Sequence, residues 1–417
     1  MRRWPLTARG ALALLLSVAC FAAAAVTGLV ELQVFGMLLA ALVIVCLLWV
    51  LFTRRRGEVE RSAVPEAPAV GDTVTIRLLA RVLSTWSVPA GRWHDRLSTG
   101  LSGDTSRMLP GIGSAWRDAD RTIAWSYQVL ARRRGVHRLG PSTVTIADPF
   151  GLTRRDVRVG GAWSLVVTPA AVSLDPAGSV AGGAGGARSS LTSRFTQGYD
   201  DLVARPWMPG DSVRRVHWRA SAHRDELMVR QEEHETSPAA TVVFDAAGSR
   251  FAPAGGVPGL DPRFEAAVTA CVSVAAYLAR SGFDVAVTDV EGRTLCDPLA
   301  AGDEDGIQGL LLAFAEVRTH LDDDLSGLVA RFGGADAGPL VLVTGMIGET
   351  DAAALSALSG RSVLPVLLAV GAGDGAVAAA RGWRGGAVRP DGDPEALTAQ
   401  LAEIWTAAVE GRPYAGR

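Results

Sequence analysis

The sequence predicts a multidomain chain with an N-terminal transmembrane helical hairpin, an antiparallel β-sandwich, and a doubly wound α/β domain. Three observations lead to this prediction. Two apolar runs without a charged residue lie near the N-terminus, at residues 11–30 and 35–52. Short alternating segments, separated by Gly and Pro turns, follow between residues 71 and 170. After Pro238, apolar strands alternate with helical segments, a pattern typical of a parallel sheet covered on both faces.

Composition excludes several classes of function. The formal net charge is -2, which predicts neither a nucleic-acid-binding protein nor an acidic tail. All 41 basic residues are Arg, so Schiff-base chemistry on a lysine is not available. The four Cys show no CxxC spacing, which indicates neither a disulfide framework nor a zinc site. The length of 417 residues predicts two to three domains.

Residues 1–56 are predicted to form a two-pass membrane anchor. Each apolar run is long enough, or nearly so, to cross about 30 Å of hydrocarbon as a helix, with a tight turn at residues 31–34. Basic residues flank both outer ends and are absent from the turn: Arg2, Arg3, Arg9, Arg54, Arg55 and Arg56. By the positive-inside rule, both termini and the soluble domains lie in the cytoplasm, at the inner membrane. A signal peptide is the alternative for the first run, and a buried soluble hairpin is the alternative for both.

A β domain is predicted over residues 71–170, after a polar linker at residues 57–70. Its expected strands alternate apolar and polar side chains, and its expected turns contain Gly and Pro. These strands and turns are residues 73–78, 123–129, 139–141, 144–146, 148–151 and 165–167. Short strands with such turns indicate a small antiparallel β-sandwich. A Gly- and Ala-rich linker is predicted to follow at residues 171–197.

The α/β domain is predicted over residues 238–417. Its first strand, residues 241–244, ends at Asp245, and a helix is expected over residues 263–280. The remaining predictions are strands at 285–287, 340–343 and 363–370 and a closing helix around 394–409. Ligands of parallel sheets bind at the carboxyl ends of the strands, so Asp245 is expected to face any site.

Residues 198–237 contain the densest set of side chains that require specific partners. Guanidinium groups bind carboxylates and phosphates bidentately and stack on indole rings, so this segment indicates recognition chemistry. A structural ion-pair network, neutralised by nearby Asp and Glu residues, is the alternative. The candidate partner-binding or structural residues are Arg205, Trp207, Gly210, Asp211, Arg214, Trp218, Arg219 and Ser221.

This segment resembles the signature of the domain of unknown function 58 family, whose bacterial members are membrane-anchored and end in a von Willebrand factor type A-like domain. The matching positions are Arg205, Trp207, Gly210, Asp211, Arg214, Val216, Trp218, Arg219, Ser221 and Ala222. Residues 133–135, 139–141 and 148–151 also resemble a pattern found in that family. Two positions depart from the signature. Pro206 stands where the signature often has an acidic residue, so any role of that acidic residue is in doubt here, and His223–Arg224 stands where the signature has a single Arg.

The resemblance also implies where a metal ion would bind. In von Willebrand A domains a strand ends in Asp-x-Ser-x-Ser, and these oxygens hold Mg²⁺ or Mn²⁺ together with a Thr and a second Asp. Here the segment has Ala247 in place of the first Ser, and Thr344-Gly345 stands where the second Asp is expected. Asp245 and Ser249 are therefore a degenerate remnant, and no metal or other cofactor is expected. Weak binding of Mg²⁺ or Mn²⁺ at this remnant is the alternative.

The same resemblance implies a function in protein interaction. Such proteins accompany MoxR-type AAA+ ATPases, and sometimes transglutaminase-like membrane proteins, in complex maturation or in the handling of the cell envelope. We therefore expect a membrane-anchored cytoplasmic adaptor or assembly protein. Its expected partners are a MoxR-type AAA+ ATPase and the lipid bilayer, with no nucleic acid.

Catalysis is not expected from the motifs. The sequence has no nucleophile elbow, Walker loop, dinucleotide-binding glycine fingerprint or His-Glu-x-x-His motif. Ser221 stands between His217 and His223, so a hydrolase at the membrane, with the Arg, His and Asp residues of 198–237 as its site, is the alternative. Nucleic-acid binding by the Arg and Trp residues is a further alternative, which the interleaved acidic residues argue against.

Overall fold

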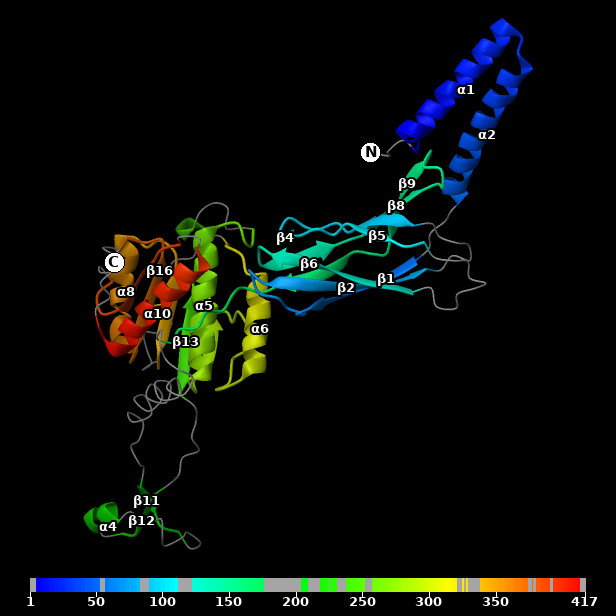
Figure 1. Ribbon diagram of the computed structural model, residues 1–417. Coiled ribbons are helices and arrows are strands. Elements are labelled where there is room, and N and C mark those ends of the chain that lie inside the picture. Colours follow the sequence, from blue (N-terminus) through cyan, green and yellow to red (C-terminus); the bar gives the residue numbers. More distant parts are fainter. Residues whose placement is uncertain are drawn as a thin grey trace. The chain divides into compact units, whose positions relative to one another are not determined.

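The computed structural model describes the chain in two compact units, Met1–Thr168 and Pro169–Arg417. Each unit is treated by itself below (Figure 1). The described residues are 5–52, 57–82, 90–111, 122–175, 204–208, 218–224, 226–230, 238–251, 257–320, 325, 328, 338–373, 377, 380–390 and 393–412.

Two antiparallel helices open the first unit, α1 (Ala8–Thr27) and α2 (Val30–Phe52). Both are long and apolar enough to cross a membrane. Gly28 ends α1 in the left-handed conformation, at φ 73°, where glycine avoids a steric cost. The Ser17 hydroxyl donates to the Gly36 carbonyl at 2.7 Å, so the helices approach closely where one of them lacks a side chain. The tight turn predicted at residues 31–34 is wrong, because these residues already belong to α2 and Gly28 makes the turn.

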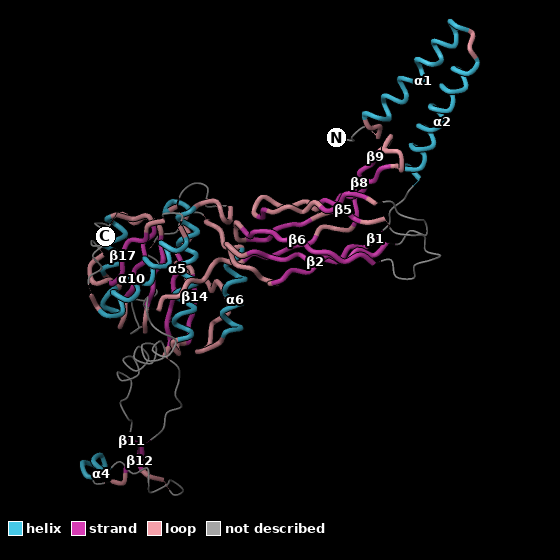
Figure 2. The backbone as a smooth tube through the Cα atoms, viewed as in Figure 1, coloured by secondary structure: helices cyan, strands magenta, loops and turns pink. Residues whose placement is uncertain are grey.

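The rest of the first unit is rich in antiparallel β-structure (Figure 2). Two four-stranded sheets have the orders β1-β2-β6-β4 and β5-β3-β8-β9, and β10 pairs with β7. The bounds are β1 Gly57–Val64, β2 Thr73–Val82, β3 Gly91–His94, β4 Leu101–Ser102, β5 Arg107–Leu109, β6 Thr122–Ala131, β7 Gly135–Leu139, β8 Ser142–Ala147, β9 Arg154–Val159 and β10 Trp163–Val167. The strands predicted at residues 73–78, 123–129, 144–146 and 165–167 are confirmed.

Residues 57–64, predicted as part of a linker, instead form β1, which pairs with β2 along its whole length. The prediction failed because an inward-facing position of β1 is Arg61, whose charge hides the alternation of the strand. Its side chain is 1% exposed and forms an ion pair with Asp95 at 3.1 Å. Tyr127 donates to the same carboxylate at 2.8 Å, and Ser142 donates to it at 3.0 Å.

One hydrophobic core serves both four-stranded sheets. It includes Ile76 and Leu78 of β2 and Val144 of β8. The rings of Trp93 and Trp125, one from each sheet, meet edge to face with centroids 4.5 Å apart. Alternate residues along each strand therefore point into a shared interior, as the period of two in the sequence predicts.

The second unit contains a five-stranded parallel sheet with the order β14-β13-β15-β16-β17. The strands are β13 Ala239–Phe244, β14 Asp284–Thr288, β15 Leu340–Thr344, β16 Pro365–Val370 and β17 Arg384–Val388. The helices are α5 Pro262–Arg280, α6 Glu304–Ala315, α8 Glu349–Ser356 and α10 Pro394–Glu410, with 3₁₀ turns η2 at Gly248–Arg250 and η4 at Ser359–Arg361. The predicted parallel α/β domain is confirmed at this level.

Local sequence explains where the main helix begins and what it covers. Asp261 caps α5 by accepting from the Arg263 N–H at 3.0 Å, and Pro262 occupies the first turn, where no backbone donor is needed. Alternate residues of β13 face opposite sides of the sheet. Phe244 joins the core under α5, whereas Val243 joins a second core that includes residues of α8. Both faces of the sheet are therefore buried.

Residues 171–175, predicted as the start of a flexible linker, lie against this domain. The Val172 N–H donates to the Ser273 hydroxyl at 2.9 Å, and Leu174 is buried in the core under α5. The rest of the predicted linker, residues 176–197, lies outside the described residues. A small antiparallel ribbon of β11 (Ala204–Pro206) and β12 (Met228–Arg230), with the short helix α4 (Trp218–Arg224), also belongs to this unit.

Candidate functional site

The strand order places the candidate site where the chain changes direction across the sheet. From β13 the chain moves to β14 on one side, and from β15 it proceeds to β16 and β17 on the other. In open α/β sheets, ligands bind at the carboxyl ends of the strands on either side of such a switch point. Here these strands are β13 and β15, which are followed by Asp245 and end in Thr344, respectively.

The Asp245 carboxylate is fully buried and is surrounded by donors. One oxygen accepts from the Ala247 N–H at 3.0 Å, in the next turn of the same loop. The other accepts from the Thr344 hydroxyl at 2.7 Å, which links the ends of β13 and β15. These contacts hold the carboxylate in place but do not neutralise its charge.

The neutralising charge comes from Arg250, at the end of the 3₁₀ turn that follows β13. Its Nε lies 2.7 Å from the Asp245 oxygen that Thr344 also contacts. At this distance the guanidinium and the carboxylate form an ion pair. Nη1 of the same guanidinium donates to Asp351 at 2.7 Å.

Asp351 brings a second carboxylate to this edge from the first turn of α8. Its Oδ2 also accepts from the Gly348 N–H at 3.0 Å, so the carboxylate caps the helix as well as binding the guanidinium. Arg250 therefore joins β13 and α8 through charged groups on both sides. A buried charge is tolerated when it is paired and hydrogen-bonded in this way.

The residues at this edge do not fit a divalent cation. Such an ion needs several oxygen ligands, and the guanidinium of Arg250 already stands against the carboxylate that would be first among them. Across the part of the chain that is described, no group of three or more His, Cys, Asp and Glu could hold a metal. Ser249, the other residue of the predicted remnant, is exposed on the 3₁₀ turn. The arrangement binds charge internally rather than presenting it to a ligand.

Part of the signature segment lies in the ribbon and in α4, and part lies outside the described residues. Gly210, Asp211 and Arg214 are in the second group. Arg205 is paired with Val229 across the ribbon. The ribbon continues one step further, because the Trp207 N–H donates to the Leu227 carbonyl at 2.7 Å.

Ser221 holds α4 against the ribbon. Its hydroxyl accepts from the Met228 N–H at 2.9 Å and also contacts the Met228 carbonyl at 3.4 Å, and the Met228 side chain is buried. Trp218 and Arg219 begin the same helix. The ribbon and α4 therefore form one local element, and Ser221 helps to hold it together.

Around this element, large apolar side chains face solvent. Trp218 is 68% exposed, and Trp207, Met208 and Leu227 are also exposed. We call these four residues the signature patch. Exposed aromatic and Met side chains are enriched at protein-protein interfaces.

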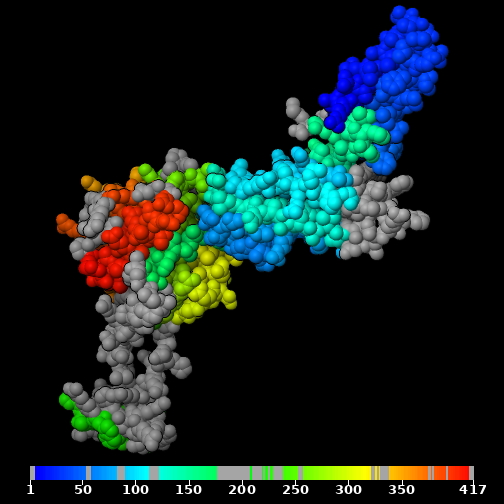
Figure 3. Space-filling view, viewed as in Figure 1, coloured from blue at the N-terminus to red at the C-terminus, as the bar shows by residue number. Residues whose placement is uncertain are grey.

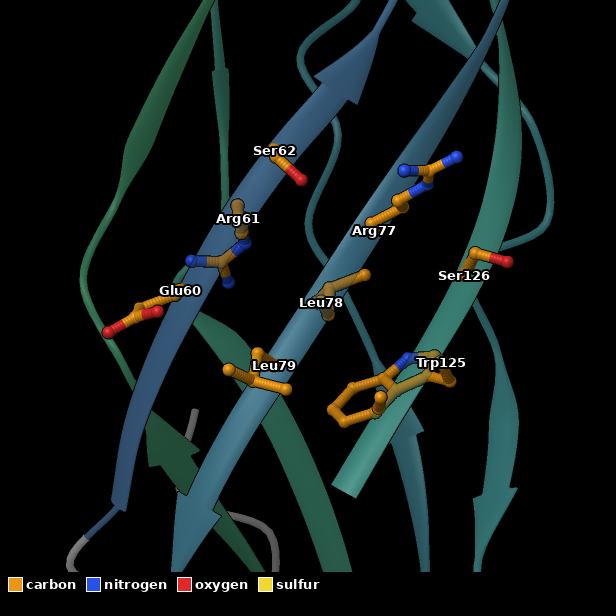
Figure 4. Close-up of a pocket in the computed structure, with 9 residues that line it drawn as sticks. Glu60, Arg61, Ser62, Arg77, Leu78, Leu79, Trp125 and Ser126 are labelled. Atoms are coloured by element: carbon orange, nitrogen blue, oxygen red, sulfur yellow. The ribbon is translucent and has the colours of Figure 1, made fainter. Parts of the chain in front are cut away.

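A separate hollow of about 560 Å³ lies on the β1-β2-β6 sheet of the first unit (Figure 4). Its rim includes the polar side chains of Ser62, Arg77 and Ser126, one from each of the three adjacent strands. Leu78 and Trp125, which also belong to the core, form part of its lining. This open hollow provides no nucleophile with a base beside it, so we assign no chemistry to it.

Arg250 and Asp351 were missed by the sequence reasoning, which considered only oxygen ligands for a metal. The sequence gives no signal for Arg250, because only the 3₁₀ turn Gly248–Arg250 brings its guanidinium back to Asp245. Asp351 is seven residues beyond Thr344, and only the start of α8 brings it to the same edge. Thr344 was noted as a departure from the expected Asp, and the structure shows that it binds Asp245.

Residues 203–369 match the family described as Protein of unknown function DUF58, which confirms the resemblance inferred from the signature. No curated protein sequence matches the chain. Among solved structures, one similar to part of the chain is a von Willebrand factor type A protein from Catenulispora acidiphila, at 15% identity and TM-score 0.28, covering 42% of this chain and 43% of that one. The CARDB domain of the PF1109 protein from Pyrococcus furiosus is 13% identical at TM-score 0.18, covering 26% of this chain and 93% of that domain. Scores this low do not establish a shared fold.

Proposed function

We propose that this chain, which matches the DUF58 family over residues 203–369, is a membrane-anchored cytoplasmic adaptor or assembly protein that works with a MoxR-type AAA+ ATPase. A transglutaminase-like membrane protein is a further candidate partner. The partner class comes from the family resemblance, and complex maturation or the handling of the cell envelope is the process that it suggests.

The observation that carries the proposal is the signature patch. A small ribbon and a two-turn helix cannot bury Trp218, Trp207, Met208 and Leu227, which stay exposed. Burying one such side chain at an interface contributes about 1.5 to 3 kcal/mol, so four of them provide a strong anchor for a protein partner. The arginines of the same segment would supply specificity through bidentate contacts.

The hydrolase alternative finds less support. Ser221 is held by the backbone of Met228, and His223 is exposed on α4. His217 lies outside the described residues. At the carboxyl edge of the parallel sheet, the charged groups of Asp245, Arg250 and Asp351 bind one another.

The finer points of architecture belong to the same proposal. We take the two antiparallel sheets with their shared core as a β-sandwich, and the parallel α/β domain as von Willebrand A-like. We also take α1 and α2 as a two-pass anchor in the inner membrane with both termini in the cytoplasm. Fusion of a reporter active only in the cytoplasm to each terminus would test this orientation, and activity at one terminus alone would exclude it.

A pull-down with matched variants tests the adaptor proposal. Tagged full-length protein is recovered from its own membranes as wild type, Trp218→Ala and Val363→Ala, and co-purifying proteins are identified by mass spectrometry. Val363 is a matched control because it is an exposed apolar residue of the same unit, in a loop before β16. We expect the AAA+ ATPase with the wild type and the control but not with Trp218→Ala, with all three proteins melting alike. An ATPase missing from the wild type, or retained equally by all three, would refute the proposal.

A further inference from the structure

The loop between β8 and β9, residues 148–153, is fastened to the start of the first apolar helix. The Thr7 N–H donates to the Leu152 carbonyl at 2.9 Å, and the Thr7 hydroxyl donates to the Gly151 carbonyl at 2.7 Å. The Arg154 N–H donates to the Pro5 carbonyl at 2.7 Å. The chain before α1 therefore runs beside this loop like an added strand.

The same loop also contacts the second apolar helix. The Thr153 hydroxyl lies 3.2 Å from the Cys46 carbonyl oxygen, and the Arg155 guanidinium donates to the Leu51 carbonyl at 3.2 Å. Leu152 is buried against Val43 and Cys46. At Gly10 of α1, an added Cβ would overlap the Leu152 carbonyl oxygen, so this approach requires glycine. Figure 3 shows the hairpin, in dark blue, against this part of the β-structure.

The register of the hairpin gives the depth of the contact. Ser17 of α1 contacts Gly36 of α2, and the two helices are antiparallel. Moving nine residues back along α1, to its first residue Ala8, therefore corresponds to moving nine residues forward along α2, to residue 45. From there α2 continues for seven more residues to Phe52, or about 10 Å of helix. These last turns are apolar; Leu152 and Thr153 contact their beginning at Cys46, and Arg155 contacts their end at Leu51. The loop thus lies beside helix of a composition that is normally surrounded by lipid.

The exposed surface here continues the apolar surface of the hairpin. Phe150, at the tip of the loop, is 61% exposed, and Trp49 and Phe52 of α2 are exposed as well. Aromatic side chains at the ends of apolar helices typically lie at the level of the lipid headgroups. Arg9, Arg154 and Arg155 are exposed around the same loop, where their guanidinium groups match lipid phosphates in charge and geometry.

The loop is held in shape by Asp148. Its buried carboxylate accepts from the Phe150 N–H at 2.8 Å, from the Thr153 hydroxyl at 2.9 Å and from the Thr153 N–H. Burial opposes the charge, but these hydrogen bonds outweigh it and lower the pKa of Asp148, so the carboxylate stays ionised and the turn is fixed. Phe150 is therefore presented on a rigid turn, which reduces the entropy lost on insertion.

We propose that residues 148–153 form a membrane-dipping loop, with Phe150 inserted into a phospholipid bilayer beside α2 and Arg9, Arg154 and Arg155 on the headgroup phosphates. The proposal rests on the membrane anchor of the proposed function. It has a mechanical consequence, because the β-rich region is then fixed at the bilayer surface by two connections rather than by the chain after α2 alone.

Cysteine labelling in membranes tests the position of Phe150. Met108, at 63% exposure in β5, matches Phe150 at 61% and serves as the control. Full-length Phe150→Cys and Met108→Cys are placed in phosphatidylcholine–phosphatidylglycerol vesicles and treated with a membrane-impermeant maleimide, with wild type as the background. Three native thiols are buried and that of Cys296 is half-buried, so this background is low. In open vesicles, where both faces are accessible, the comparison does not depend on orientation.

We expect Phe150→Cys to react about tenfold more slowly than Met108→Cys in vesicles, because apolar burial favours the inserted position. In a second experiment the two introduced cysteines carry a fluorescent bimane, and the proteins are placed in detergent micelles that contain brominated phospholipid. The bromine should quench the bimane fluorescence at position 150 but not at position 108. Equal labelling rates in vesicles, or no preferential quenching at position 150, would overturn the loop proposal. Release of the wild-type protein from the vesicles by carbonate would instead overturn the membrane anchor, so the two failures are distinguishable.

Discussion

Arg250 is expected to be among the most important single side chains for the stability of the α/β domain. In Arg250→Met a side chain of similar length remains, but the Asp245 carboxylate, at 0% exposure, loses this cation, while the Ala247 N–H and the Thr344 hydroxyl stay in place as neutral donors. Removing one partner of a buried ion pair costs about 3 to 5 kcal/mol, because an uncompensated charge is left behind. For a domain of this size, that corresponds to a fall in Tm of roughly 6 to 20 °C.

A double-mutant cycle separates the ion pair from packing. Asp245→Asn in the Arg250→Met background removes the stranded charge, so the double variant should be more stable than Arg250→Met alone. Arg280→Met is the control, because Arg280 pairs with Glu304 at the surface, with side chains 41% and 61% exposed, and its loss should cost less than about 1 kcal/mol. Urea denaturation and calorimetry of the full-length protein in detergent measure these differences.

Two results would refute this reasoning. Equal losses for Arg250→Met and Arg280→Met would mean that the buried pair carries no special weight. Stabilisation of the wild type by micromolar Mg²⁺ or Mn²⁺, abolished in Asp245→Ala, would mean that a cation takes the place assigned to Arg250.

Three further predictions concern groups elsewhere in the chain. Burial, with the Asp95 charge second, raises the pKa of Tyr127, so its stabilising contribution is complete below about pH 10, the unfolded value, and falls as the pH rises above it. Tyr127→Phe should cost about 1.5 to 3 kcal/mol at neutral pH and flatten the dependence of the urea midpoint on pH above about pH 10, and an unchanged slope would contradict this. Burial raises the pKa of Cys296 to about 11, so alkylation by iodoacetamide should be slow at neutral pH and rise about tenfold per pH unit towards that value, whereas a plateau near pH 8 would be inconsistent. Gly10→Leu should detach the Leu152 loop and increase its cleavage by proteases in detergent, and unchanged cleavage would argue against the close contact.

The elements that the sequence predicted well have a simple pattern of apolar residues. β2 and β6 bury alternate residues, α5 is apolar along most of its length, and the two N-terminal helices are uninterrupted apolar runs. β1 was missed because the interior accepts Arg61 once Asp95 and Ser142 bind it and Tyr127 binds Asp95, and these three residues come from three distant segments of the chain. The residues after Thr168 were assigned to a linker because Gly and Ala dominate that tract, although Leu174 is buried in the core.

Only one of the two central residues of the candidate site, Asp245, could be predicted from the sequence. Asp245 could be placed, because a residue that follows a buried parallel strand lies at the edge where ligands bind. Its partner Arg250 could not be assigned, because the 3₁₀ turn that directs the guanidinium back to the sheet depends on tertiary contacts. Among these, the Gly248 N–H donates to the His320 carbonyl at 2.9 Å, and the Met346 N–H donates to the Arg250 carbonyl at 3.0 Å.

Two buried charged clusters, one in each unit, share a property that bears on function. Arg61 with Asp95 and Arg250 with Asp245 are buried pairs, and the groups around them donate to the carboxylates instead of facing a substrate. An enzyme needs polar groups aimed at a reacting atom, whereas an adaptor needs exposed apolar surface that a partner can cover. Such surface is present at Trp218 and its neighbours and, facing lipid in our proposal, at Phe150. In our two proposals, the signature patch serves recognition and the loop of residues 148–153 fixes the β-rich region at the membrane, while the buried ion pairs stabilise the domains.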